Sequence, residues 1–141
     1  GRLEINDDCI TAYKSNMKAI DIDASQIPDL VPIIAVMAAL SEGRAAIKNA
    51  GRLRIKESDR LKAIAMELNK IGGKITELDD GLVIEGVKRF TGGTVDCWND
   101  HRIAMALAIA ATRCNKPLVI MGQESVKKSY INFWDDYKKL V

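Results

Sequence analysis

The sequence predicts an α/β (α+β) fold built from repeated βαβαββ units, and three observations support it. Strand-like and helix-like segments alternate along the chain, which is typical of folds with helices packed on a sheet. Asp79-Asp80-Gly81 separates two apolar stretches, a strong hairpin signal. The same number of residues separates Asp29 from Asp100 and Glu57 from Lys128, so the pattern of the first unit restarts in the second half.

The expected order is β-α-β-α-β-β followed by β-α-β-α. A hairpin at residues 2–13 comes first. The first part then has strands at 19–23, 44–48, 74–78 and 82–85 and helices at 29–40 and 58–71. The second part comprises a strand at 94–97, a helix at 103–111 buried on every side, a strand at 117–121, and a last helix carrying Phe133, Trp134, Tyr137 and Leu140. We expect one partial domain over 1–141, with the hairpin at about 2–13, a full unit at about 18–86 and an incomplete unit at about 93–141.

The helix at 58–71 shows the clearest periodicity. Its apolar positions recur every three or four residues, at Leu61, Ile64, Ala65, Leu68 and Ile71. The opposite face is expected to be polar, with Lys62, Glu67, Asn69 and Lys70. Ser58 or Asp59 is placed to cap this helix, and Asp29 and Asp100 are placed to cap the helices that follow them.

Composition excludes several classes of protein. A chain of 141 residues with 48% apolar residues is long enough to bury a core. A net charge of +2 and 5% aromatic residues argue against nucleic acid and against a membrane surface. Cys9, Cys97 and Cys114 form no metal-spaced cluster, and their odd number favours a reducing cytoplasm. The chain starts at Gly1 in strand-like sequence, so we expect a piece of a longer protein.

Alternating charges fill the stretch from Arg54 to Arg60, directly before the periodic helix. Arg60 falls in the first helical turn, where the helix dipole disfavours positive charge, and this indicates an anionic ligand. The alternative is a solvated helix start with offsetting ion pairs, the commoner explanation of a generic charge cluster. If the two units superpose, several helix N-termini gather at one edge with the basic residues Lys56, Arg60, Arg102 and Lys128. A phosphate or carboxylate substrate would suit that edge.

Four segments resemble one family in order and in register. Lys56-Glu57-Ser58-Asp59-Arg60 and Asn99-Asp100-His101-Arg102-Ile103-Ala104-Met105 resemble two signature segments of the 5-enolpyruvylshikimate-3-phosphate synthases. Ile27-Pro28-Asp29 and Lys128-Ser129-Tyr130 are similar to two further segments. The resemblance implies the C-terminal third of such an enzyme, part of one domain of the inside-out α/β barrel of enolpyruvyl transferases.

That family transfers the enolpyruvyl group of phosphoenolpyruvate to the 5-hydroxyl of shikimate 3-phosphate, in the shikimate pathway to chorismate and aromatic amino acids. The resemblance implies a cytoplasmic transferase that uses no metal or organic cofactor. Its partners would be the two substrates and the missing N-terminal part of the same enzyme, with no nucleic acid and no membrane. This chain alone is expected to be inactive, because the catalytic lysine and the sugar-phosphate-binding serines of the family belong to that missing part.

The resemblance also implies roles for single residues. Glu57 is matched to the carboxylate that transfers a proton at the methylene carbon, and Asp29 to a residue that holds the shikimate hydroxyls and is a candidate base. Lys56 is matched to the shikimate-phosphate site. The residues expected to grip phosphoenolpyruvate are Arg60, His101, Arg102 and Lys128.

Each assignment has an alternative. His101 could simply bond a neighbour in the first helical turn, Asp100 could be a cap only, and Lys128 could form a solvated pair with Lys127. Ile131 stands where the family usually has proline, which leaves the exact placement of Lys128 open. Three other functions also remain open: a UDP-N-acetylglucosamine enolpyruvyl transferase, a phosphate- or RNA-end-binding βαβαββ module, and a structural half-domain that awaits a partner.

Overall fold

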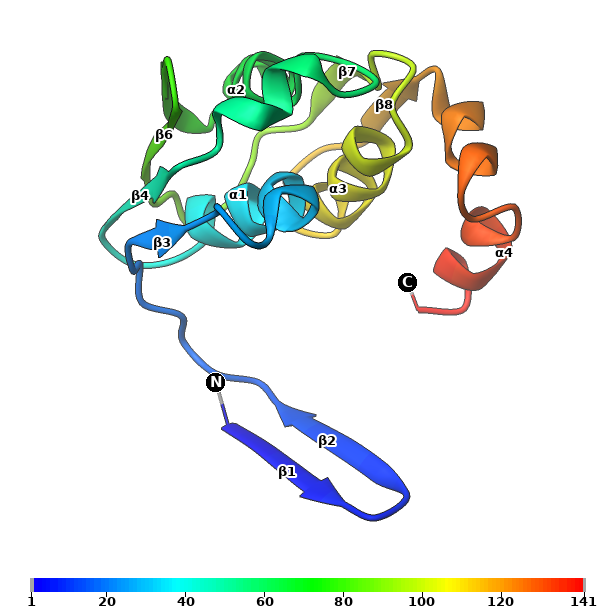
Figure 1. Ribbon diagram of the computed structural model, residues 1–141. Helices are drawn as coiled ribbons and strands as arrows, with labels where there is room; N and C mark the ends of the chain where they lie inside the picture. The colour runs from blue at the N-terminus through cyan, green and yellow to red at the C-terminus, as the bar shows by residue number, and fades with distance from the viewer. Residues whose placement is uncertain (1, 141) are drawn as a thin grey trace.

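The computed structural model describes residues 2–140 (Figure 1). Its strands and helices follow one another in the order β1 Arg2–Asn6, β2 Cys9–Tyr13, β3 Ile22–Asp23, η1 Pro28–Leu30, α1 Val31–Ala39, β4 Arg44–Lys48, η2 Gly51–Ile55, α2 Arg60–Lys70, β5 Lys74–Leu78, β6 Gly81–Glu85, β7 Gly93–Asp96, α3 His101–Ala111, β8 Leu118–Met121, η3 Gln123–Lys128 and α4 Phe133–Tyr137, where η marks a 3-10 helix. After the leading hairpin, the predicted order of strands and α-helices is therefore confirmed.

Two sheets form the body of the fold. The larger has the strand order β3-β4-β6-β5, in which β3 and β4 run parallel and β6 runs antiparallel to both of its neighbours. The smaller pairs β7 with β8 in parallel, with Val95 opposite Ile120. Each parallel pair is joined through an α-helix, α1 in the first sheet and α3 in the second, as parallel strands require.

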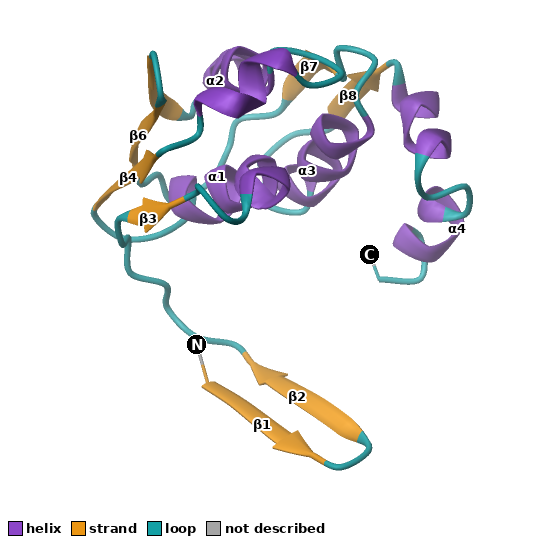
Figure 2. Cartoon of the chain, viewed as in Figure 1, coloured by secondary structure: helices purple, strands orange, loops and turns teal. Residues whose placement is uncertain are grey.

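The helices α1, α2 and α3 lie together at the centre of the molecule, with β3, β4 and β6 on one side and β7 and β8 on the other (Figure 2). The predicted apolar stripe of α2 is buried, including Leu61, Ile64 and Leu68, each 0% exposed. Leu107 of α3 joins the same core. This packing brings the starts of η1, α2 and α3 near one another. None of the described helices has the length and apolar character needed to cross a membrane.

The hairpin β1-β2 extends away from this body (Figure 1). Every one of its strand residues is exposed. The pairing of Leu3 with Ala12 and of Ile5 with Ile10 puts these four apolar side chains on one face. A two-stranded hairpin is marginally stable by itself in water, so this face is suited to packing against another surface.

Three elements differ from the predictions. The strand expected at 19–23 is reduced to Ile22–Asp23, because the Asp21 carboxylate accepts the Ala46 N–H at 3.0 Å in place of a backbone ladder bond. The helix expected to be buried on every side leaves Ile109 38% exposed. The last helix is short, Phe133–Tyr137, and the preceding segment forms the 3-10 helix η3 that ends at Lys128.

The caps agree with the predictions at two helices and differ at the third. Asp59 caps α2 by accepting the Lys62 N–H at 3.0 Å, and Asp100 caps α3 by accepting the Arg102 N–H at 2.9 Å. Asp29 does not cap α1, because the 3-10 turn η1 runs directly into that helix and puts Leu30 at the cap position. The carboxylate of Asp29 is therefore available for other partners.

Candidate functional site

The guanidinium of Arg60 lies at the centre of a cluster of charged side chains. The Arg60 side chain is 1% exposed and donates to three carboxylates. Its Nε donates to Asp100 Oδ2 at 2.7 Å, one terminal nitrogen donates to Asp29 Oδ1 at 2.8 Å, and the other donates to Glu57 Oε2 at 2.6 Å. Such charge-assisted bonds, sharing one planar guanidinium, fix the relative positions of the three carboxylates.

These carboxylates come from three separate parts of the chain. Asp29 lies in η1, Glu57 in the loop before α2, and Asp100 at the cap of α3. The helix starts therefore converge, as the sequence pattern indicated. Arg60 and Arg102 lie close to each other, because both pair with the carboxylate of Asp29.

Asp29 is the second centre of the cluster. Its carboxylate lies 2.8 Å from Arg60, 3.3 Å from Arg102 and 3.8 Å from Lys56. The Asp29 backbone carbonyl also accepts a bond of 3.2 Å from Arg102. Five of the seven predicted site residues (Asp29, Lys56, Glu57, Arg60 and Arg102) are thus linked by ion pairs.

The deepest pair in the cluster joins Arg60 to Asp100, which is 0% exposed. Burial raises the pKa of Asp100, but bonds from Arg60, the Arg102 N–H and the Ser58 hydroxyl outweigh burial and hold that pKa below its ordinary value. Burial likewise lowers the pKa of Arg60, but the hydrogen bond to Asp100 and the negative charges of Asp100, Glu57 and Asp29 together outweigh burial and raise that pKa above its ordinary value. Both groups are therefore ionised at neutral pH.

The unusual position of Arg60 in the first helical turn thus has a structural explanation. Carboxylates surround its charge, as the ion-pair alternative proposed, although Arg60 itself is buried and its pair with Asp100 is buried on both sides. The carboxylates of Asp29 and Glu57 remain 45% and 43% exposed, in contrast to Asp100. An incoming anion could therefore reach Arg60 only by exchanging with these two exposed partners.

His101 and Lys128 complete the predicted set. His101 is 8% exposed, and no described residue supplies a hydrogen-bond partner for its Nδ1 atom. Lys128 donates its ammonium to the backbone carbonyl of Asn99, directly before the cap of α3. This exposed bond places Lys128 beside the start of α3.

Sequence reasoning missed one feature of the cluster. Asp100 was expected to be a cap, and it is also the buried partner of Arg60, with Ser58 donating to the same carboxylate at 3.0 Å. The available signal was the unusual positive charge of Arg60 at one helix start, together with a carboxylate, Asp100, at another. That signal does not indicate which carboxylate binds which arginine.

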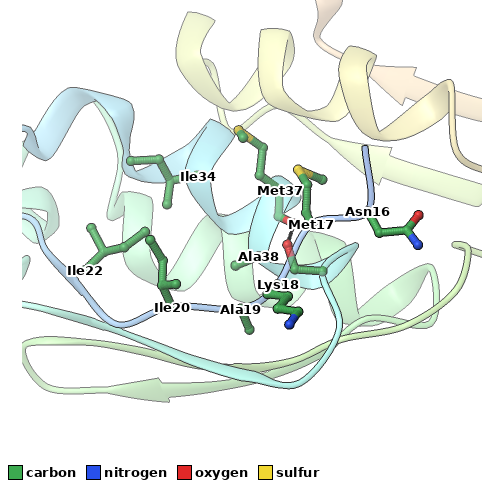
Figure 3. A pocket seen from close by; sticks show the side chains of 10 residues that line it. Asn16, Met17, Lys18, Ala19, Ile20, Ile22, Ile34, Met37 and Ala38 are labelled. Atoms are coloured by element: carbon green, nitrogen blue, oxygen red, sulfur yellow. Dashed lines mark hydrogen bonds between the residues drawn. The ribbon is translucent and has the colours of Figure 1, made fainter. Parts of the chain in front are cut away.

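Of the hollows beside the helices, two bear on the candidate site. One of about 200 Å³ adjoins the cluster and is lined in part by Asp29, Arg102 and Phe133. The other, of about 530 Å³, lies between α1 and the segment before β3 and is lined by apolar side chains such as Ile20, Ile34 and Met37 (Figure 3). None of its lining residues belongs to the charged cluster, so only the smaller hollow is suited to the predicted chemistry.

Comparison with known proteins agrees with this picture. Residues 3–137 match the family model of EPSP synthase (3-phosphoshikimate 1-carboxyvinyltransferase). The chain is 60% identical over 136 residues to the 3-phosphoshikimate 1-carboxyvinyltransferase of Clostridium acetobutylicum, covering 96% of this chain and 32% of that protein. Its counterpart from Clostridium novyi is 54% identical over 138 residues, covering 98% of this chain and 32% of that protein.

A solved structure shows the same arrangement of elements. The EPSP synthase from Acinetobacter baumannii superposes with a TM-score of 0.81 at 33% identity, covering 88% of this chain and 30% of that one. The chain thus spans about a third of the length of the relatives it matches. The family match over nearly all of its residues shows that this chain belongs to the EPSP synthase (3-phosphoshikimate 1-carboxyvinyltransferase) family.

Proposed function

We propose that this chain supplies the C-terminal part of an enzyme that transfers the enolpyruvyl group of phosphoenolpyruvate to the 5-hydroxyl of shikimate 3-phosphate. The observation that carries the proposal is the cluster around Arg60, in which η1, α2 and α3 bring acids and bases together. The charges of the cluster balance, with Lys56, Arg60 and Arg102 against Asp29, Glu57 and Asp100. Such a cluster can receive an anion when one of its carboxylates moves away.

Binding of phosphoenolpyruvate would proceed by exchange at Arg60. A carboxylate or phosphate group of the substrate replaces the exposed carboxylates of Glu57 and Asp29, while Asp100 keeps its bond to Nε and its longer bond of 3.3 Å to one terminal nitrogen. Arg102, His101 and Lys128 surround the same helix start and add positive charge or donors to that anion. The exchange leaves the carboxylates of Glu57 and Asp29 unpaired beside the substrate, where they can transfer protons.

The two released carboxylates would then act as acid and base. In the addition step, Glu57 gives a proton to the methylene carbon, the 5-hydroxyl oxygen bonds the adjacent carbon, and Asp29 takes the hydroxyl proton. In the elimination step, the bond to phosphate breaks, the leaving phosphate takes up the proton that Asp29 accepted, and the methyl carbon returns its proton to Glu57. Lys56, 3.8 Å from Asp29, is placed to bind the 3-phosphate of the sugar.

The remaining assignments follow from the same proposal. The hairpin at about 2–13, the unit at about 18–86 and the incomplete unit at about 93–141 would belong to one domain, with the rest of the enzyme closing the site from the other side. Closure matters because half of a site cannot exclude water or orient two substrates. The free cysteines Cys9, Cys97 and Cys114 suit a reducing cytoplasm.

A chimera tests the proposal directly. In it this chain replaces the matching third of the Clostridium acetobutylicum relative, and phosphate release is measured with phosphoenolpyruvate and shikimate 3-phosphate. We expect release with both substrates present and none when shikimate 3-phosphate is omitted. A soluble, folded chimera without activity would contradict the proposal.

The substitution Glu57→Gln in the chimera tests the assigned acid. Loss of a general acid–base group typically costs about 10²- to 10⁴-fold in rate, and we expect a loss of that size in kcat. Glu85→Gln is the control, because Glu85 is an exposed residue at the end of β6. Full activity of the Glu57→Gln chimera would refute the role of Glu57.

A further inference from the structure

Glu67, the one carboxylate within α2, is completely buried although its position on the helix predicted a solvent-facing side chain. It lies two turns after Arg60, so the two side chains project from the same stripe of α2. Oε1 accepts the Trp98 indole N–H at 2.8 Å, and Oε2 accepts the backbone N–H of Asp96 at 3.0 Å. The ammonium of Lys70 bonds both oxygens at 2.8 Å. The prediction of an exposed Glu67 was therefore wrong, because β7 and Trp98 cover that part of α2.

The residues that Glu67 binds belong to the segment 96–100, which connects β7 to α3. Trp98 and Asn99 both have positive φ, 54° and 53°, a backbone conformation uncommon for residues other than glycine. A segment in that conformation needs contacts that hold it in place. Helix α2 supplies them at both ends, since Glu67 binds Asp96 and Trp98, and Arg60 binds Asp100.

This segment positions the basic side chains of the candidate site. The Asn99 carbonyl accepts the ammonium of Lys128, and Asp100 caps the helix that carries Arg102. A shift of the segment would therefore displace Lys128 and Arg102 together. Asp29 and Lys56 lie outside the segment, on η1 and in the loop before α2. Asp29 would lose its contacts with Arg102 but keep its shorter bond to Arg60.

We propose that Glu67 is a positioning residue that holds segment 96–100 in its turn and thereby sets the phosphoenolpyruvate-binding side chains Arg102 and Lys128. The inference rests on the function proposed above. Glutamine is a poor substitute at this position, because all the groups bonded to Glu67 are donors. The amide NH₂ of glutamine would face one of these donors and lose that bond.

The test compares Glu67→Gln with Glu85→Gln in the chimera. For Glu67→Gln we expect the KM for phosphoenolpyruvate to rise about 10- to 100-fold, the range expected for a small displacement of binding groups. The KM for shikimate 3-phosphate should change less than about 2-fold, because Arg60 still holds Asp29 and Lys56 lies outside the displaced segment. Equal rises in both constants, or no rise in either, would overturn the inference.

Two further measurements keep the result interpretable. Trp98→Phe removes one of the bonds to Glu67 and retains an aromatic ring, so it carries the test if Glu67→Gln does not fold, with a smaller rise in the same KM expected. In the 141-residue chain, the indole N–H NMR resonance of Trp98 should move in Glu67→Gln while that of Trp134, bonded to the Gln123 carbonyl, stays in place. An unmoved Trp98 resonance would overturn the inference as well.

The two proposals fail in different ways. An unsubstituted chimera without phosphate release overturns the proposed function, and the role of Glu67 in it falls too. An active chimera whose KM for phosphoenolpyruvate is unaffected by Glu67→Gln overturns the inference alone.

Discussion

Replacing Asp100 by asparagine separates its role as an ion-pair partner from its role as a helix cap. Asparagine is as good a cap as aspartate, so the bond to the Arg102 N–H is retained. The charge that faces the buried guanidinium of Arg60 is lost. Removing one partner of a buried ion pair typically costs about 3–5 kcal/mol. For Asp100→Asn we expect the free energy of unfolding to fall by about 3 kcal/mol, at the low end of this range, because Arg60 keeps Asp29 and Glu57 as partners.

Urea unfolding of the 141-residue chain, followed by circular dichroism, measures this change. With a urea dependence of about 2 kcal/mol per molar, a loss of about 3 kcal/mol lowers the unfolding midpoint by about 1.5 M. Asp100→Ala should lose about 1 kcal/mol more, because it also removes the cap. Asp135→Asn is the control, since its carboxylate is 78% exposed and lies 3.8 Å from Lys138. A loss below about 1 kcal/mol for Asp100→Asn would refute the reasoning.

The stability lost in Asp100→Asn should also depend on pH. The pKa of Asp100 is lower in the folded protein than in the unfolded chain, so the ion pair contributes its full stability above the unfolded pKa and loses it as the pH falls through the folded pKa. Asparagine does not titrate. The difference in unfolding free energy between the unsubstituted chain and Asp100→Asn should therefore be largest at neutral pH and narrow below about pH 4. A difference independent of pH would show that the charge of Asp100 is not responsible.

Two predictions concern parts of the chain outside the cluster. A thiol reagent should modify exposed Cys9 rapidly at neutral pH and leave Cys97 unmodified until the chain unfolds, because burial raises the pKa of Cys97 to about 12. Mass spectrometry of the modified peptides measures the labelling of each cysteine, and rapid labelling of Cys97 would contradict its burial. Gly81→Ala should destabilise the chain by about 1–3 kcal/mol, because the added Cβ would lie 2.0 Å from the Ile47 carbonyl oxygen. Urea unfolding measures the loss, with Thr76→Ala on the exposed face of β5 as the control. Equal stability of the two variants would contradict the close approach of Gly81 to Ile47.

Most of the fold could be predicted because the sequence patterns that indicate its helices and strands involve residues close together in the chain. The apolar stripe of α2 and its cap at Asp59 depend on residues within a few positions of one another, and both are observed. The strand at 19–23 was overestimated because a side chain, Asp21, replaces a backbone partner of Ala46, 25 residues away in sequence. A pattern of apolar and polar residues does not distinguish a carboxylate that faces solvent from one that completes a sheet.

The buried polar contacts could not be predicted for the same reason. Glu67 lies at a position of α2 that helical periodicity assigns to solvent, and its partners Asp96 and Trp98 are 29 and 31 residues away. Arg60 was recognised as unusual from local rules, but Asp100 lies 40 residues from it. The repeat pattern predicted that the basic residues gather at one edge, and the resemblance to a family gave the site residues their roles. The structure adds which charge faces which.

The three carboxylates on Arg60 differ in a way that divides its roles. Asp100 is fully buried and also caps α3, so its displacement would cost both an ion pair and a helix start. Asp29 and Glu57 bind the terminal nitrogens of the same guanidinium and remain nearly half exposed, so water and an incoming anion can replace them. One arginine can therefore stabilise the fold through Asp100, which it bonds at Nε and, at 3.3 Å, at one terminal nitrogen, while its bonds to Asp29 and Glu57 exchange for an anion. The same exchange would release the two exposed carboxylates without disturbing the buried pair that fixes the start of α3.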